Sequence, residues 1–185
     1  MDVKGSAITV LPAFIKERFG AARLQQWLSS LPADAQAVFR DGVLISDWYP
    51  ITQTYLEPTA LLCEQFYNGD SIGAHEIGRF SADYALKGIY KAFVKLSSVK
   101  SFITRANTVM TTYYRPSAME ISAVGDGRLV LHITIFPVPS EYAELRIAGW
   151  IQRSLEIHGC KEVTWAIPRS LAKQDALTEL VFTWK

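Results

Sequence analysis

The sequence predicts an α+β fold in which a helical N-terminal half packs on a four-stranded antiparallel sheet, ordered ββαββ, in the C-terminal half. Three observations predict it. Apolar residues recur at helical spacing before residue 117, strict alternation with polar residues appears after it, and no repeat or low-complexity linker divides the chain. A chain of 185 residues has the length of one domain, so we expect residues 1–185 to form a single domain.

The first expected helix covers residues 6–19, where Ile8, Leu11 and Ile15 recur at spacings of three and four before Gly20 ends the helix. Its apolar residues lie on more than one side. Such a helix is either buried on two sides within its own chain or pairs with another chain.

Proline and glycine residues mark the expected ends of the next helices. Residues 21–31 stop at a proline, and a short helix over residues 33–39 ends at the Asp41-Gly42 turn. Residues 51–67 have a helical pattern but include Pro58, which either kinks this helix or splits it into two pieces.

The run Asn68-Gly69-Asp70-Ser71 predicts a turn that supplies an N-cap. A helix is expected from there to about Lys87, with Ile77, Phe80 and Tyr84 on one face. Two further helical stretches are expected, over residues 89–96 and 99–113.

Strict alternation begins at Ala118 and predicts a hairpin. The two strands lie on either side of the Gly125-Asp126-Gly127 turn. The residues expected on the buried face of these strands are Met119, Ile121, Ala123, Leu129, Leu131, Ile133 and Ile135.

An amphipathic helix and a second pair of strands complete the expected fold. The helix covers residues 141–158 and ends at Gly159. A strand around residues 163–167 is expected to stop at Pro168, and the last strand covers residues 178–185. The residues expected to be buried here are Leu145, Ala148, Ile151, Leu155, Leu180, Phe182 and Trp184.

Composition excludes several classes of partner. The net charge of +1 provides no field that would attract nucleic acid or an anionic membrane. No apolar run approaches the ~20 residues that cross a bilayer, and residues 1–5 do not begin a signal peptide. We therefore expect a cytoplasmic protein with no nucleic acid partner and no membrane span. Cys63 and Cys160 are expected to be reduced, buried thiols, with a disulfide between them as the alternative.

Catalytic motifs are missing from the sequence. It has no Gly-x-Ser-x-Gly elbow, no cysteine beside a histidine and no glycine-rich phosphate loop before a helix. Glu76 and Asp83 could share a helix face, but such pairs usually form a solvated stripe. We expect no enzyme activity, and we expect Gly69, Gly73 and Gly78 to permit close helix packing.

Two short segments and the order of elements carry a family resemblance. Residues 46–50 read Ser-Asp-Trp-Tyr-Pro, and residues 169–180 contain Asp175, Thr178 and Glu179. The chain resembles a superfamily that includes the H-NOX (heme nitric-oxide/oxygen binding) domains, the 4-vinyl-reductase-type ligand-binding domains and the TRAPP tethering subunits.

The last segment resembles two family patterns and departs from each. Asp175 matches both the Cys-x-x-x-Gly-Asp-x-x-Cys pattern of the 4-vinyl-reductase type and the Gly-Asp-x-x-Thr-Glu pattern of TRAPP subunits. Thr178 and Glu179 match only the TRAPP pattern. Ser170 and Thr178 stand where the two cysteines would be, and Gln174 replaces the glycine, which removes the metal site of some relatives.

The resemblance also raises the question of heme. H-NOX domains use a helix-borne histidine as the iron ligand and a Tyr-x-Ser-x-Arg clamp for the propionates. The stretch 102–110 contains no histidine, and residues 113–117 hold tyrosine, arginine and serine in a different order. No two of His75, His132 and His158 are close enough in sequence to form a zinc motif. We therefore expect no heme, no other cofactor and no metal.

Aromatic residues make up 12% of the chain, and most fall in the helical half. They either fill the core or line a cavity between helices and sheet. The resemblance favours a cavity for a small apolar or aromatic ligand, because relatives hold heme, aromatic molecules or acyl chains there. The candidate ligand-binding residues are Trp48, Tyr49, Tyr84, Tyr90, Phe93, Tyr113, Tyr114 and Arg115.

Two functional hypotheses follow from the resemblance. The first is a non-enzymatic small-molecule-binding sensory or regulatory domain of the H-NOX/4-vinyl-reductase-like type, read by an unknown protein partner. The alternative is a TRAPP-like homodimeric interaction scaffold with a filled core and no ligand. In either case the resemblance implies a homodimer.

Overall fold

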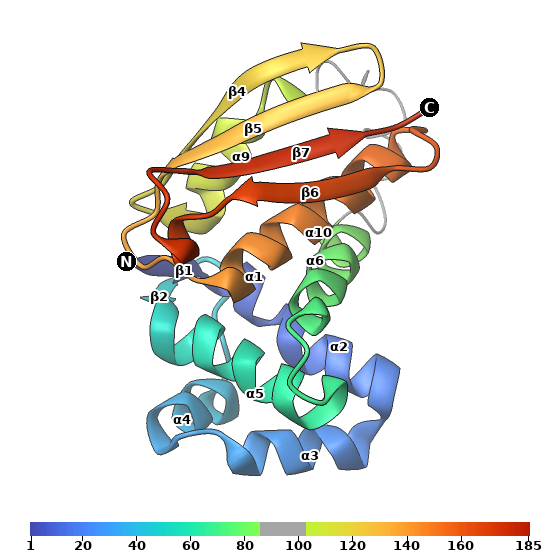
Figure 1. Cartoon of the computed structure of the whole chain (residues 1–185). Helices are drawn as coiled ribbons and strands as arrows, with labels where there is room; N and C mark the ends of the chain where they lie inside the picture. Colours follow the sequence, from blue (N-terminus) through green and yellow to red (C-terminus); the bar gives the residue numbers. More distant parts are fainter. Residues whose placement is uncertain (86–102) are drawn as a thin grey trace.

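The computed structural model describes residues 1–85 and 103–185. Helices form the lower part of the molecule and a four-stranded sheet forms the upper part, with α6 and α10 between them (Figure 1). The helices are α1 (Gly5–Ile8), α2 (Val10–Phe19), α3 (Ala21–Ser30), α4 (Ala33–Asp41), α5 (Glu57–Tyr67), α6 (Ile72–Ala85), α9 (Ala106–Tyr113) and α10 (Glu141–Ile157). The strands are β1 (Asp2–Lys4), β2 (Trp48–Pro50), β3 (Tyr114–Arg115), β4 (Ala118–Gly125), β5 (Arg128–Ile135), β6 (Thr164–Arg169) and β7 (Thr178–Thr183).

The C-terminal sheet has the order β4-β5-β7-β6, and every neighbouring pair is antiparallel. This confirms the predicted α+β fold with a ββαββ half. In the central pair, Leu129 lies opposite Phe182 and Leu131 lies opposite Leu180, and all four side chains are buried. These residues form the sheet side of the main core, which α9 and α10 cover.

Strands β4, β5 and β6 depart from the predicted pattern at single positions. Ile121 is 38% exposed and Ile135 is 49% exposed, although alternation placed both on the buried face. Met119 lies opposite Ile133 and Ile121 lies opposite Leu131 in one continuous register, so Ile121 shares a face with the buried Met119. It is exposed because β4 is an edge strand that is uncovered from Glu120 to Gly125, and the register shifts only after Ile121. Pro168 lies inside β6 rather than ending it, which the sheet tolerates because β6 is an edge strand.

A second, three-stranded sheet of order β2-β1-β3 was not predicted from the sequence. Its strands have two or three residues each, too short for alternation to be visible. Strand β1 brings Trp48 opposite Lys4 and Arg115 opposite Asp2, so the N-terminus is paired to two distant segments.

The apolar sides of the first predicted helix are buried inside the chain. The helix is divided into α1 and α2, and Val10, Leu11, Phe14 and Ile15 are all buried in a cluster formed with α3, α5 and α6. Burial on two sides within the chain therefore accounts for the pattern. Pro58 lies in the first turn of α5, directly after a π-helical segment (Thr52–Leu56), so the winding of the helix changes before the proline but residues 51–67 stay helical without a break.

The turn between β6 and β7 is organised around one buried carboxylate. Glu144 of α10 is 5% exposed and accepts hydrogen bonds from the hydroxyls of Ser170 (2.6 Å) and Thr178 (2.5 Å) and from the backbone N–H of Ala172 (3.2 Å). Ser170 and Thr178, which stand where the 4-vinyl-reductase pattern has cysteines, thus hold this turn against α10 through Glu144.

The conformation of the same turn also accounts for Asp175 and Gln174, two further positions of the family patterns. The carboxylate of Asp175 accepts a 2.7 Å hydrogen bond from the backbone N–H of Ser170. Gln174 has a φ of 69°, in the left-handed region that favours glycine, and it stands where the family pattern has glycine.

Helices α6 and α10 cross with their backbones in contact. A Cβ added to Gly78 would lie 2.1 Å from the carbonyl oxygen of Arg146, and one added to Gly149 would lie 2.1 Å from that of His75. The prediction that Gly78 permits close packing is confirmed, and Gly149 is its counterpart on α10. Gly69 instead has a φ of 80° and serves the turn after α5.

Candidate functional site

A cavity of about 470 Å³ lies between the helical layer and the sheet, beside the crossing of α6 and α10. Ligand pockets commonly have volumes of about 300–1,000 Å³ and mostly apolar linings. The lining combines aliphatic, aromatic and a few polar side chains from nearly every part of the fold. The lining residues are Ser6, Ala7, Thr9, Val10, Ile45, Tyr55, Gly78, Ser81, Tyr84, Ala85, Ile103, Val109, Met110, Tyr113, Tyr114, Met119, Leu129, Leu131, Arg146, Ile147, Trp150 and Ile151.

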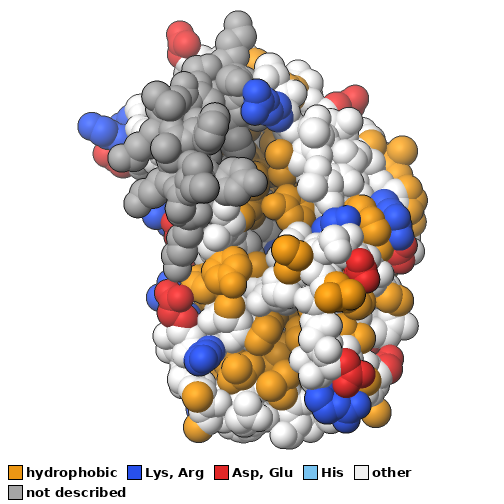
Figure 2. Space-filling model, turned by 180° about the vertical axis from the view of Figure 1, so that it is seen from behind, with side chains coloured by type: hydrophobic (Ala, Val, Ile, Leu, Met, Phe, Trp, Pro, Cys, Tyr) orange, Lys and Arg blue, Asp and Glu red, His pale blue; other side chains and the backbone are white. Residues whose placement is uncertain are grey.

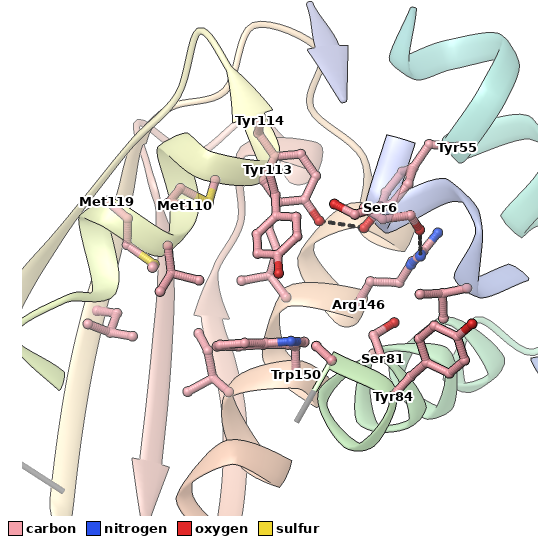
Figure 3. A pocket seen from close by; sticks show the side chains of 18 of the residues that line it. Ser6, Tyr55, Ser81, Tyr84, Met110, Tyr113, Tyr114, Met119, Arg146 and Trp150 are labelled. Atoms are coloured by element: carbon pink, nitrogen blue, oxygen red, sulfur yellow. Dashed lines mark hydrogen bonds between the residues drawn. The ribbon is translucent and has the colours of Figure 1, made fainter. Parts of the chain in front are cut away.

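The polar and apolar parts of the cavity lie at opposite sides. Figure 3 shows Arg146, Ser81 and Tyr84 on one side, and Met110 and Met119 on the other. An apolar molecule with one polar end would match this division.

Two lining side chains are also surface residues. Ile45 is 66% exposed and Tyr84 is 47% exposed, so the cavity reaches the surface beside them. From behind, hydrophobic side chains gather along the middle of the molecule (Figure 2).

A tyrosine pair closes the cavity next to the small sheet. The hydroxyls of Tyr55 and Tyr114 are 2.5 Å apart, and the two rings meet edge to face. Burial, reinforced by the neighbouring Tyr55, raises the pKa of Tyr114 well above its ordinary value of 10. The Tyr114 hydroxyl therefore stays protonated near neutral pH.

The buried cation Arg146 comes from α10 and is 3% exposed. Its guanidinium carbon lies 3.7 Å from the centroid of the Tyr55 ring, which is a cation–π contact. Because the carbonyl of Arg146 touches Gly78, the helix crossing fixes the backbone from which this side chain starts.

The structure brings three of the predicted ligand-binding residues to the cavity: Tyr84, Tyr113 and Tyr114. Tyr90 and Phe93 lie outside the described residues.

Trp48, Tyr49 and Arg115 are placed elsewhere. They belong to the small sheet, where the guanidinium of Arg115 lies 4.2 Å from the ring of Trp48 and pairs with Asp2, and the hydroxyl of Tyr49 accepts the N–H of Leu44. The unpredicted strand pairing β2-β1-β3 directs these side chains away from the cavity lining.

Sequence reasoning missed Arg146, Trp150 and Ser81. One signal was available: Arg146 and Trp150 are four residues apart on α10, flanking its apolar stripe. A charged residue beside such a stripe usually reaches solvent, so the pattern alone did not indicate a buried guanidinium.

The histidines do not line the cavity among the described residues. His75 is 4% exposed and stacks on Trp165 with ring centroids 4.5 Å apart, and burial lowers its pKa to about 4. His132 pairs with Glu179 at 2.9 Å on the sheet, and the imidazole of His158 lies 2.7 Å from the carbonyl of Ser154. Residues 86–102 contain no histidine in their sequence.

Both cysteines are buried and free, so the predicted thiols are confirmed in place of a disulfide. Burial raises the pKa of Cys63 to about 11. Within the described ranges, no group of three His, Cys, Asp or Glu side chains could hold a metal ion. No helix in those ranges has the length and apolarity needed to cross a membrane.

Comparison with known proteins gives a match in structure alone. No family model matches the sequence, and neither does any curated protein. An H-NOX protein from S. oneidensis in the Fe(II)NO state matches with a TM-score of 0.73 and 12% identity, over 98% of this chain and 99% of that one. An unliganded Fe(II) H-NOX mutant from K. algicida matches with a TM-score of 0.72 and 10% identity, over 98% and 96%. The IWP-051-bound H-NOX from Shewanella woodyi in the Fe(II)CO state has a TM-score of 0.69 and 15% identity, over 98% and 94%.

These matches confirm the predicted resemblance at the level of the fold. They also overturn the expectation that no cofactor accompanies it. The matching proteins are described in Fe(II) states, and another was solved to probe heme distortion in the H-NOX family. The absence of a sequence motif for the iron ligand led to the wrong expectation, because a fold can be kept at about 10% identity while short motifs change.

Proposed function

We propose that this chain, which has the H-NOX fold, is a non-enzymatic sensory domain that binds a small molecule in the cavity between its helices and its sheet. The observation that carries the proposal is the cavity itself, about 470 Å³ with an apolar lining and a few polar groups on one side. Protein cores are close-packed and contain few voids larger than a water molecule. A void of this size therefore suggests an occupant.

The cavity also suggests how occupancy would be sensed. Its lining comes from α1, α6, α9, α10 and the sheet, so a bound molecule would contact every layer. A ligand that fits one arrangement of these helices better than another shifts the population toward it. A partner protein could then recognise the changed surface.

Heme is the occupant that the fold family implies, and the lining fits it in part. The cavity is large and apolar, and Arg146 could pair with a propionate. Histidine ligation does not fit, because no described lining residue is a histidine.

The available iron donors are the thioethers of Met110 and Met119 and the phenols of the lining tyrosines, of which heme proteins use both kinds. When bound, heme would supply an iron that can take a diatomic gas. The residues of this chain would hold the macrocycle and exclude water.

The test is ligand binding with a blocked cavity. Purified protein is titrated with hemin, followed by its Soret band, and with the apolar fluorophore 1-anilinonaphthalene-8-sulfonate. Ser81 lines the cavity from α6, so Ser81→Phe should place a ring inside it. Ser29→Phe is the matched control, because Ser29 is exposed on α3 and, like Ser81, donates to the carbonyl four residues before it.

We expect at least one probe to bind the natural protein and Ser29→Phe with equal affinity, and to bind Ser81→Phe at least tenfold more weakly. Failure of both probes to bind the natural protein would refute the proposal. So would equal binding to the two phenylalanine variants, because binding would then lie outside the cavity.

The alternative, a TRAPP-like homodimeric scaffold, requires a filled core, and the cavity argues against it. The apolar sides of α2 that suggested pairing are buried within the chain. A homodimer stays a prediction, and sedimentation equilibrium would test it.

A further inference from the structure

Arg146 is a buried cation that has no anionic partner among residues 1–85 and 103–185. Its Nη1 donates to the hydroxyl of Thr59 and its Nη2 donates to the carbonyl of Ala7, each at 3.0 Å. Its Nε is buried and has no acceptor among the described residues. A guanidinium has five N–H groups, so these two bonds use only part of its donor capacity.

No carboxylate of this chain is placed to neutralise it. Within residues 1–85 and 103–185, no Asp or Glu forms an ion pair with Arg146. Residues 86–102 contain no Asp or Glu in their sequence. Other buried or half-buried arginines of the helical layer are paired: Arg79 with Glu156 at 2.8 Å and Arg153 with Asp83 at 3.0 Å.

An unpaired buried charge is costly, and proteins normally pair such a group or neutralise it. Arginine cannot escape by losing its proton, because the guanidinium stays charged in proteins. The side chain lines the cavity, and its planar fork suits the two oxygens of a carboxylate. An anion in the cavity would therefore complete the pairing.

The remaining lining limits the charge and shape of that anion. Arg146 is the sole cationic residue among the described lining residues, so a single negative charge is matched and a dianionic phosphate is not. Hydroxyls of Ser6, Ser81 and Tyr84 lie on its side of the cavity, while Met110 and other apolar residues line the far side (Figure 3).

We propose that Arg146 anchors the carboxylate of an apolar ligand whose body extends toward Met110, Met119 and Leu129. This rests on the proposed function, since it assigns the ligand class of the same cavity. The carboxylate could belong to a free aliphatic acid or to a porphyrin propionate. Both share the required chemistry, a carboxylate on an apolar body.

The experiment compares ligand pairs that differ only in the carboxylate. The affinities of decanoic acid and 1-decanol, and of hemin and hemin dimethyl ester, are measured at pH 7.5 by calorimetry or absorption. A hydrogen bond to a charged group contributes enough binding free energy to make the affinity for the acid about tenfold or more higher than that for its neutral partner. If the ligand is a free acid, we expect the natural protein to bind decanoic acid more tightly than 1-decanol by this factor. If the ligand is a porphyrin, we expect it to bind hemin more tightly than hemin dimethyl ester.

The variant Arg146→Met keeps an unbranched apolar side chain and removes the charge, and it should reduce the preference for the acid to about one. The matched control Arg79→Met removes a paired arginine outside the cavity lining and should keep the preference. If Arg146→Met fails to fold, the preference in the natural protein still decides the matter.

The outcomes separate the two proposals. Equal binding of acid and neutral partner to the natural protein, or tighter binding of the neutral partner, would overturn the anchor while leaving the cavity as a ligand site. Binding of none of the four compounds would overturn the anchor and count against the proposed function as well.

Discussion

Adding one methyl group at the crossing of α6 and α10 should destabilise the protein measurably. The contact is between backbones: a Cβ on Gly78 or on Gly149 would lie 2.1 Å from a carbonyl oxygen of the facing helix. Ordinary contacts of a Cβ begin at 3.4 Å. The helices would therefore have to separate by about 1.3 Å, and no side chain can rotate away to prevent it.

The size of the effect follows from two opposing contributions. Overpacking in a core costs about 1–3 kcal/mol and occasionally more. Alanine in place of glycine within a helix returns about 1 kcal/mol through helix propensity. Because the obstructing atoms belong to rigid backbone, we expect the upper end of this cost and a net loss of about 2 kcal/mol for Gly78→Ala and for Gly149→Ala. In a chain of this length, that corresponds to a fall in Tm of roughly 4–8 °C.

Thermal and urea unfolding monitored by circular dichroism would measure the loss. Gly125→Ala is the control, because a Cβ at Gly125 meets nothing within 4 Å and its φ lies outside the left-handed region. A free energy of unfolding within about 0.5 kcal/mol of the natural protein for both helix variants would show that the crossing can relax, and the packing argument would then be wrong.

Three other predictions concern buried polar groups. Glu144→Ala removes the acceptor of three hydrogen bonds and should lower the free energy of unfolding by about 3 kcal/mol. The control Glu120→Ala changes an exposed residue and should have little effect. Similar urea midpoints for the two variants would contradict this prediction. His75 has its pKa lowered to about 4 from 6.5, so the unfolded chain binds the extra proton first. The contribution of the neutral His75 side chain to the free energy of unfolding is complete above pH 6.5. Up to about 3 kcal/mol of that free energy is lost as the pH falls toward 4. Urea unfolding at pH 7.5 and 4.5 should show a smaller difference for His75→Phe, and an unchanged difference would contradict the assignment. Cys63, with its pKa raised to about 11, should react with a thiol reagent at pH 8 only after unfolding, and rapid labelling of the folded protein at this site would be inconsistent with its burial.

Local pattern was sufficient for most elements of the fold. Leu129 and Leu131 alternate along β5, and Ala148 and Ile151 recur along α10, because each pattern depends on neighbours only a few residues away. The pattern failed at Ile121, which shares a face with the buried Met119 but lies on the part of this edge strand that is exposed.

The cavity was predicted only in part. Aromatic content identified Tyr84, Tyr113 and Tyr114, which line it. Trp48 and Arg115 have the same residue types but belong to a sheet whose strands are too short to be recognised. Composition therefore selects suitable residue types, and only the pairing of distant strands decides which of them face the cavity.

The sequence by itself determined the α+β class, the antiparallel four-stranded sheet and the buried stripe of α10, since hydrophobic periodicity specifies an element and its buried face locally. The tertiary structure alone decided that Gly78 and Gly149 bring the backbones of α6 and α10 into contact, that a cavity remains beside this crossing, and that Arg146 is buried there without a carboxylate from the part of the chain that the structure describes. The physical reason is that burial and pairing depend on which surfaces meet. In this chain, those surfaces come from residues up to about 140 positions apart, as in the bond from Arg146 to Ala7.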